Sequence, residues 1–240
     1  MLYNSNMNLY VLRLLSLLPQ FIYKRIIKKL KPPIEGFEDV VKSSVKIKEN
    51  LFDGNSKNFV KFHKDCNIYA EYGCGLSTLY SVNSMEKKTL SVDTDQAWVE
   101  KILKHSKNKS LLNIQHVDLG ATGNWGMPQN YLKRNNIKIY LKSLWAYKEK
   151  PDFILIDGRF RVASFLTSLK YASKDAIICF DDYVDREIYH IVEEFEKPFL
   201  EDKRQAYFKV KGDYDLKFLD FTIENLNMCF LNIKNLKFIK

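Results

Sequence analysis

The sequence predicts an α/β fold with a mostly parallel sheet and helices on both faces. Two nearly continuous apolar runs, 152–156 and 176–180, are typical of strands buried on both faces of a parallel sheet. A glycine turn at 71–79 follows the apolar residues 68–70 and precedes a helical pattern, which indicates a strand–turn–helix unit. With 240 residues, 46% of them hydrophobic, the chain can bury one sizeable core, and no repeat or low-complexity linker indicates a second catalytic domain.

The predicted elements alternate along the chain after a leading helix within 45–64. They are strand 67–72, helix 77–85, strand 89–93, helix 95–106, strand 112–117, a helix near 129–145, strand 152–156, helix 160–172, strand 176–180 and helix 185–196. Two further strands are predicted near 206–210 and 228–233.

The glycine turn has the composition of a cofactor-binding loop. Gly73 and Gly75 allow a sharp turn and a close approach of the backbone to a ligand, and Ser77 or Thr78 can cap the following helix. Helix N-termini of this kind bind anionic or zwitterionic cofactors through backbone amides. The third glycine of the dinucleotide fingerprint is missing, which disfavours an NAD-dependent oxidoreductase. A plain tight turn is the alternative.

Two more aspartates, Asp93 and Asp118, stand at the carboxyl ends of predicted strands. Asp93 ends the second strand about 20 residues after the glycines, where a carboxylate can accept both ribose hydroxyls of a nucleoside. Asp95 is expected to cap the helix that follows. Asp118 ends the third strand. Capping or turn roles are the alternatives for Asp93 and Asp118.

Three carboxylates follow the two most apolar strands. Asp157 closes the first run, and Asp181 and Asp182 close the second. Ligands of parallel sheets bind beyond the carboxyl ends of the strands, so these carboxylates are expected to converge there. Like charges gathered without a counterion are costly, and a hard cation with oxygen ligands, Mg²⁺ above all, would balance them. Separate turn and cap residues are the alternative.

These motifs, over roughly residues 65–197, resemble the class I S-adenosylmethionine-dependent methyltransferases. An acidic residue, Glu71, stands two positions before Gly-x-Gly, as in motif I of that family. The resemblance implies a Rossmann-like sheet, mostly parallel with an antiparallel last strand, and S-adenosylmethionine as cofactor. It also implies that Asp118 reaches the exocyclic amine of adenine, and it makes Glu71, Gly73, Gly75, Ser77, Thr78, Asp93 and Asp118 the cofactor-binding set.

A strand ending in Ile-Asp-Gly, a helix, and a strand ending in Asp-Asp-Tyr resemble the metal-dependent sugar O-methyltransferases of the macrocin type. That resemblance implies Asp157, Asp181 and Asp182 as Mg²⁺ ligands, with Asp157 also the catalytic base. The macrocin pattern continues Asp-Gly-Asp, whereas here Gly158 is followed by Arg159. The continuation, together with the glycine-rich segment 120–128, resembles instead a group of bacterial class I methyltransferases associated with surface glycans, in which metal dependence is open.

Three further residues are predicted to contact substrate. Arg159 and Arg161 directly follow an active-site strand, where arginines clamp carboxylate or phosphate groups by paired hydrogen bonds. Salt bridges at a helix start are the alternative. Trp125 lies in a segment with three glycines and a proline and can stack on adenine or sugar. A turn filler is its alternative.

The net charge of +9 invites a nucleic-acid partner, because basic surfaces attract phosphates. The lysines are spread along the chain, however, and no RNA-binding motif occurs, so nucleic acid is not expected as a partner. The four cysteines show no Cys-x-x-Cys spacing, which argues against a zinc knuckle or a disulfide framework and favours a reducing, cytoplasmic compartment.

The amino-terminal segment 1–35 differs from the methyltransferase domain predicted at 36–240. Residues 1–34 hold six Lys or Arg and no Asp or Glu, and the stretch 8–31 is amphipathic and basic. An interfacial helix on the anionic inner face of a membrane is one reading, and a helix that packs on its own domain or in a homo-oligomer is the other. The apolar run is too short and interrupted for a predicted transmembrane span.

The expected function is therefore S-adenosylmethionine-dependent O-methylation. The expected acceptor is a small molecule or glycan, with the hydroxyl on a sugar or a glycan precursor. If the enzyme is metal-dependent, Mg²⁺ is a second cofactor. A non-catalytic nucleoside-binding or membrane-associated scaffold of the same fold is the alternative, and a nucleic-acid methyltransferase is another. The three convergent carboxylates favour an enzyme over a non-catalytic scaffold, because a scaffold does not need them.

Overall fold

The computed structural model describes residues 37–123 and 126–226. The chain divides into two compact units, Met1–Asp39 and Val40–Lys240, and the following account concerns the second. The basic segment 1–35, with its predicted membrane contact at 8–31, lies outside the described residues. Of the helices in the described part, none combines the length and the apolar character that a membrane span requires.

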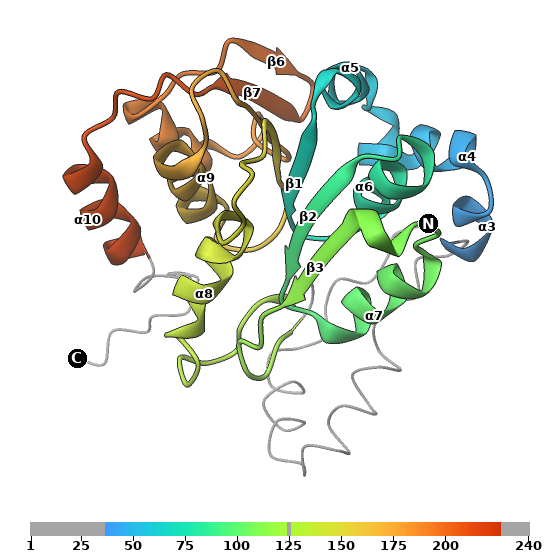
Figure 1. Ribbon diagram of the computed structural model, residues 1–240. Helices are drawn as coiled ribbons and strands as arrows, with labels where there is room; N and C mark the ends of the chain where they lie inside the picture. The colour runs from blue at the N-terminus through green and yellow to red at the C-terminus, as the bar shows by residue number, and fades with distance from the viewer. Residues whose placement is uncertain (1–36, 124–125, 227–240) are drawn as a thin grey trace. The chain divides into compact units, whose positions relative to one another are not determined.

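The second unit is built on one seven-stranded sheet with the order β3-β2-β1-β4-β5-β7-β6 (Figure 1). Its strands are β1 (Ile68–Tyr72), β2 (Lys88–Asp93), β3 (Leu112–His116), β4 (Phe153–Ile156), β5 (Ile177–Phe180), β6 (Leu200–Asp202) and β7 (Gln205–Lys209). Strands β1 to β5 are parallel to one another, and β7 is antiparallel to both β5 and β6. The predicted fold, a mostly parallel sheet with an antiparallel strand near one edge, is confirmed.

Helices cover both faces of this sheet. The helices of the described residues are α3 (Phe37–Val41), α4 (Ser44–Asn50), α5 (Lys57–Asp65), α6 (Leu76–Leu79), α7 (Gln96–His105), α8 (Asn136–Lys142), α9 (Arg161–Tyr171) and α10 (Leu216–Leu226). Figure 1 shows α8, α9 and α10 grouped on one side of the strands and α6 and α7 on the other, and α9 contacts both α8 and α10. A π-helical turn, Tyr80–Ser84, continues α6.

The core explains why the apolar runs predict the sheet so well. All four residues of β4 are buried, as are Ile178, Cys179 and Phe180 of β5, because helices pack on both faces of these central strands. Of α9, seven consecutive residues, 163–169, are buried as well. The two strands that precede the acidic residues are therefore enclosed on both faces.

Some predicted boundaries are wrong. The helix expected near 129–145 begins only at Asn136, after the glycine-rich connection, and the helix expected at 185–196 is a 3-10 helix, Glu187–Glu194. The strand near 206–210 is β7, but its partner is β6, which precedes it; 228–233 lies outside the described residues. The β6–β7 hairpin was missed because Lys203 takes a left-handed φ of 55°, a role that turn patterns assign to Gly or Asn.

Candidate functional site

Two loops meet at the carboxyl ends of β1 and β4. Gly73 follows β1 with a φ of 94°, and a Cβ placed on it would lie 2.7 Å from the Cα of Gly158, which follows β4. A Cβ on Gly158 would in turn lie 2.3 Å from the hydroxyl of Tyr140. Both glycines are therefore required for packing, since neither position has room for a side chain.

Gly75 has a different environment. A Cβ built on Gly75 meets no atom within 4 Å, and the residue precedes α6 with its amide bonded to the Thr78 hydroxyl at 2.8 Å. Open space beside a glycine at the carboxyl end of the central strands is what close approach of a ligand to the backbone requires. The structure thus separates the two glycines of the motif: Gly73 holds the loops together, and Gly75 leaves space.

Glu71 lies fully buried in β1 beneath this loop. Its carboxylate accepts hydrogen bonds from the hydroxyls of four residues: Ser77 at 2.6 Å, Tyr69 at 2.8 Å, Ser91 at 2.9 Å, and Thr78. Burial raises the pKa of Glu71 to about 7, against the effect of these donors. The side chains of Glu71, Ser77 and Thr78 are buried and bonded to one another, so they fix the shape of the loop. Their part in cofactor binding stays a prediction.

Asp93 connects the glycine loop to the end of β2. One of its carboxylate oxygens accepts from the amide of Cys74 at 2.9 Å, and the other from the amide of Asp95 at 2.8 Å. Burial raises the pKa of Asp93. The side chain is only half-buried and stands next to the open space at Gly75's loop, so its position agrees with a ribose ligand. Asp95 caps α7 as predicted, accepting from the amide of Ala97 at 3.1 Å.

Asp118 and Trp125 do not gain support as ligands. Asp118 is exposed after β3, accepts from the amide of Gly120 at 2.7 Å and forms an ion pair with Lys133. The hydrogen bond from the Lys133 side chain is the main cause that lowers the pKa of Asp118. This is the turn role that the sequence left open, and adenine contact stays a prediction. Trp125 lies outside the described residues.

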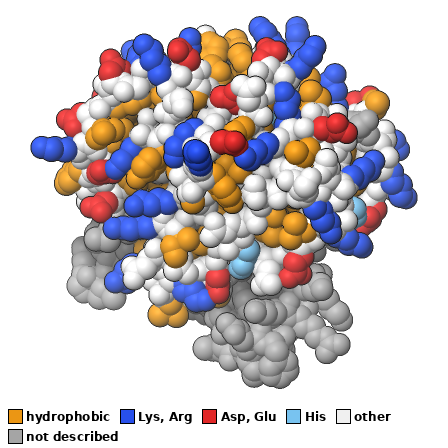
Figure 2. Space-filling view, in the orientation of Figure 1, with side chains coloured by type: hydrophobic (Ala, Val, Ile, Leu, Met, Phe, Trp, Pro, Cys, Tyr) orange, Lys and Arg blue, Asp and Glu red, His pale blue; other side chains and the backbone are white. Residues whose placement is uncertain are grey.

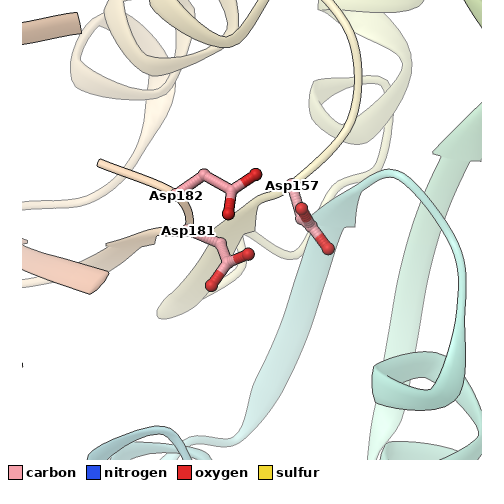
Figure 3. A group of neighbouring side chains, drawn as sticks. All are labelled: Asp157, Asp181 and Asp182. Atoms are coloured by element: carbon pink, nitrogen blue, oxygen red, sulfur yellow. The ribbon is translucent and has the colours of Figure 1, made fainter. Parts of the chain in front are cut away.

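The three predicted carboxylates do converge. Asp157 follows β4, Asp181 and Asp182 follow β5, and one ligand oxygen from each lies within 4.8 Å of the others (Figure 3). Successive side chains of a strand point to opposite faces. Asp182 escapes this alternation through a left-handed φ of 56°, so that its carboxylate reaches the same cluster as that of Asp181.

Three arginines balance these three carboxylates. Arg161 bonds Asp157 at 2.8 Å and lies 3.3 Å from Asp182; Arg204 bonds Asp181 at 2.8 Å and also Asp182; and Arg186 bonds Asp182 at 2.7 Å. Gln205 donates to the remaining oxygen of Asp181 at 2.9 Å. The argument for a metal assumed that the acids lack a counterion, and this assumption is wrong. The arginines already compensate the three acids, so the cluster does not require Mg²⁺ for charge balance.

Asp157 is the carboxylate of the cluster that faces outward. Its side chain is 37% exposed, compared with 1% for Asp181, and its second oxygen accepts no hydrogen bond within the described part of the chain. Burial raises the pKa of Asp157 to about 7 against the opposing charge of Arg161, and Asp181 and Asp182 add to the rise. A carboxylate with a pKa near neutrality can remove a proton efficiently at neutral pH.

The two arginines predicted as a substrate clamp have separate roles. Arg161 is buried, and its guanidinium bonds the carbonyls of Gly158 at 3.2 Å, Asp157 at 3.0 Å and Asp181. The guanidinium thus binds the strand ends, which matches the salt-bridge alternative, and its contact with substrate stays a prediction. Arg159 is half-buried, and its backbone amide donates to the Tyr140 hydroxyl at 3.1 Å.

Sequence reasoning missed Arg186 and Arg204. Arg186 carried a local signal, since it stands four residues after Asp182. Arg204 carried none, because it reaches Asp181 only through the turn between β6 and β7.

Comparison with known proteins identifies the fold. No family model matches the chain, and no curated protein does. A methyltransferase-like protein from Silicibacter pomeroyi is similar in structure, with a TM-score of 0.65 and 28% sequence identity over 72% of this chain and 92% of that one. The chain therefore has the Rossmann-like fold of the class I S-adenosylmethionine-dependent methyltransferases.

Two further structures match more weakly. The N-methyltransferase NodS from Bradyrhizobium japonicum has a TM-score of 0.43 and 11% identity, over 68% of this chain and 99% of that one. An RNA methyltransferase from Salinibacter ruber, in complex with S-adenosyl-L-homocysteine, has a TM-score of 0.40 and 10% identity, over 75% and 95%. Likenesses at these scores carry no argument about the site.

The basic charge of the chain is not gathered in one place on the face shown. Figure 2 shows Lys and Arg side chains of the described residues interspersed with acidic and apolar ones. A phosphate backbone is bound by a continuous basic surface.

Proposed function

We propose that this chain is an S-adenosylmethionine-dependent O-methyltransferase that acts on a hydroxyl of a sugar or glycan precursor, with Asp157 as general base. The observation that carries the proposal is the position of Asp157. Its outward-facing carboxylate, with a pKa raised to about 7 by burial, follows β4 and so stands beside the glycine loop that follows β1. A base next to a cofactor loop is the arrangement that methylation of a neutral hydroxyl requires.

The roles of the residues follow from their contacts. When bound, S-adenosylmethionine supplies an electrophilic methyl group, and the demethylated sulfide leaves. Gly75 leaves space for that ligand, and Asp93 accepts from its ribose hydroxyls. Asp157 would take the proton that the acceptor hydroxyl loses on methylation. Arg161 keeps the Asp157 carboxylate oriented through its other oxygen.

Cofactor binding is the first test. Isothermal titration of the wild type with S-adenosylmethionine and S-adenosylhomocysteine should show binding. Gly75→Val, whose added Cβ enters open space, should leave the melting temperature unchanged and remove binding, and Asp93→Ala should weaken it by roughly 1 kcal/mol or more because the ribose hydroxyls lose their acceptor. Preferential binding of NAD by the wild type would overturn the assignment.

Magnesium dependence is the second test, since the acid trio also matches the ligand type of that ion. With an acceptor found by screening sugars and glycan fragments, methyl transfer should continue in EDTA, because Arg161, Arg186 and Arg204 already balance the carboxylates. Loss of turnover in EDTA that Mg²⁺ restores would instead assign the trio to the metal and leave the methyltransferase proposal in place.

A further inference from the structure

Four arginines lie at or near the carboxyl ends of β4 and β5, and one of them differs from the rest. Arg161, Arg186 and Arg204 each bond at least one of the three aspartates. Among the residues that the structure describes, the guanidinium of Arg159 donates no hydrogen bond and forms no ion pair; the residue is bonded through its backbone amide and carbonyl only. Arg159 is thus the one guanidinium of these four that has no ion-pair partner among the described residues.

Arg159 lies between the two functional halves of this edge. It directly follows Gly158, which packs against Gly73 of the cofactor loop, and it stands two residues after Asp157. Its charge acts on Asp93, where it opposes the rise in pKa, and Asp157 in turn supports the charge of Arg159. The half-buried Arg159 therefore interacts electrostatically both with Asp93, the proposed ribose ligand, and with Asp157, the proposed base.

We propose that Arg159 binds a carboxylate or phosphate group of the methyl acceptor, so that the acceptor is an anionic sugar unit. A partly desolvated cation without a hydrogen-bonded counterion is costly, and a bound anion would supply that partner. The planar guanidinium matches carboxylate and phosphate oxygens in a paired arrangement. The position of Arg159 on the same loop as Asp157 favours the acceptor over the cofactor as the source of the anion. The inference rests on the proposed methyltransferase function.

The test uses the full chain saturated with S-adenosylhomocysteine. Three probes of similar size are titrated into it: glucuronate, glucose 1-phosphate and glucose. The wild type should bind at least one charged probe about tenfold more tightly than glucose, the ratio that one charge-assisted bidentate contact provides. Arg159→Gln should reduce the ratio to within about twofold, and Arg159→Lys should keep part of it because the charge remains.

Arg134→Gln is the matched control, because it removes an exposed arginine before α8 and should change nothing. Melting temperatures of all variants should agree, since the Arg159 side chain has no partner to lose among the described residues. Equal affinity of the wild type for charged and neutral probes, with S-adenosylhomocysteine still bound, overturns the inference and leaves the methyltransferase proposal standing. Failure of the wild type to bind S-adenosylhomocysteine overturns both.

A last experiment distinguishes the acceptor from the cofactor as the source of the anion that Arg159 binds. 5′-Methylthioadenosine lacks the amino-acid carboxylate of S-adenosylhomocysteine. Arg159→Gln should leave the affinities for both nucleosides unchanged. If the variant weakens S-adenosylhomocysteine and not 5′-methylthioadenosine, the anion that Arg159 binds is the carboxylate of the cofactor, and the inference about the acceptor is wrong.

Discussion

The two halves of the strand-end edge hold buried carboxylates by different means. On the β1 side, Glu71 is surrounded by hydroxyl groups, which carry no charge. On the β4 and β5 side, the three aspartates are balanced by arginines. Hydroxyls can donate to a carboxylate or accept from a carboxylic acid, so the Glu71 site tolerates either protonation state. Guanidinium groups only donate, which favours ionised aspartates.

This difference bears on what each half can do. The hydroxyl network fixes the shape of the glycine loop, and the loop leaves open space at Gly75. The ion-pair network keeps Asp181 and Asp182 occupied and leaves one oxygen of Asp157 directed outward. We infer that the β1 side forms a preorganised ligand-binding loop and that the β4 and β5 side provides a single reactive carboxylate.

Removal of that carboxylate should have the largest effect. Asp157→Asn keeps the size of the side chain and an oxygen that can accept from Arg161, but the amide cannot take a proton. We expect kcat to fall by roughly 10²–10⁴-fold, the usual contribution of general base catalysis, with binding of S-adenosylhomocysteine unchanged. Asp213→Asn, which alters an exposed aspartate, is the control.

The pH dependence of the same reaction refines this prediction. With a pKa of about 7 for Asp157, kcat/KM of the wild type should rise with pH and level off above about 7, as the base loses its proton. The residual activity of Asp157→Asn should lack this rise. If the substituted enzyme keeps both the rate and the profile, another group is the base.

The second effect concerns stability and compares two arginines that bond Asp182. Arg204 also bonds the buried Asp181, whereas Arg186 is 49% exposed and bonds Asp182 alone among the aspartates. Arg204→Gln leaves a buried carboxylate without its cation and should lower the free energy of unfolding by roughly 3 kcal/mol. Arg186→Gln should cost at most about 1 kcal/mol, as exposed ion pairs do. If urea unfolding gives the same loss of unfolding free energy for both variants, burial of the partner carboxylate does not decide how much each arginine stabilises the fold.

The same contrast explains what the sequence could predict. The hydrogen bonds of the glycine loop join residues that are close in sequence. Glu71 bonds Ser77 and Thr78, so the spacing of these residues alone indicates the motif. The strands of the acid trio are visible as apolar runs, and parallel strands bring their ends together. The counter-charge of Arg204 depends on the β6–β7 hairpin, whose left-handed residue is a lysine that no turn pattern selects.

A second omission had a readable signal. The helix α10 was not predicted, although Asp215 caps it by accepting from the amides of Lys217 at 2.9 Å and Phe218 at 3.1 Å. Leu219, Ile223 and Leu226 repeat at helical spacing after it. The roles of Arg159 and Arg161 could not be separated in this way, because both follow the same strand and only the three-dimensional contacts distinguish them.

The smallest expected effect tests the hydroxyl half through its titration. The pKa of Glu71 is about 7 in the folded chain, raised by burial from 4.5. Between these values the folded state holds a proton that the unfolded chain releases, so the free energy of unfolding should decrease as pH rises from about 4.5 to 7 and then stay level. Glu71→Gln removes this titration. Urea unfolding between pH 5 and 8 should therefore show a shallower decrease for the variant, with the remaining slope due in part to Asp157, whose pKa is raised in the same direction. If both proteins show the same slope, Glu71 is ionised throughout, and the four hydroxyls hold a charged carboxylate in the core.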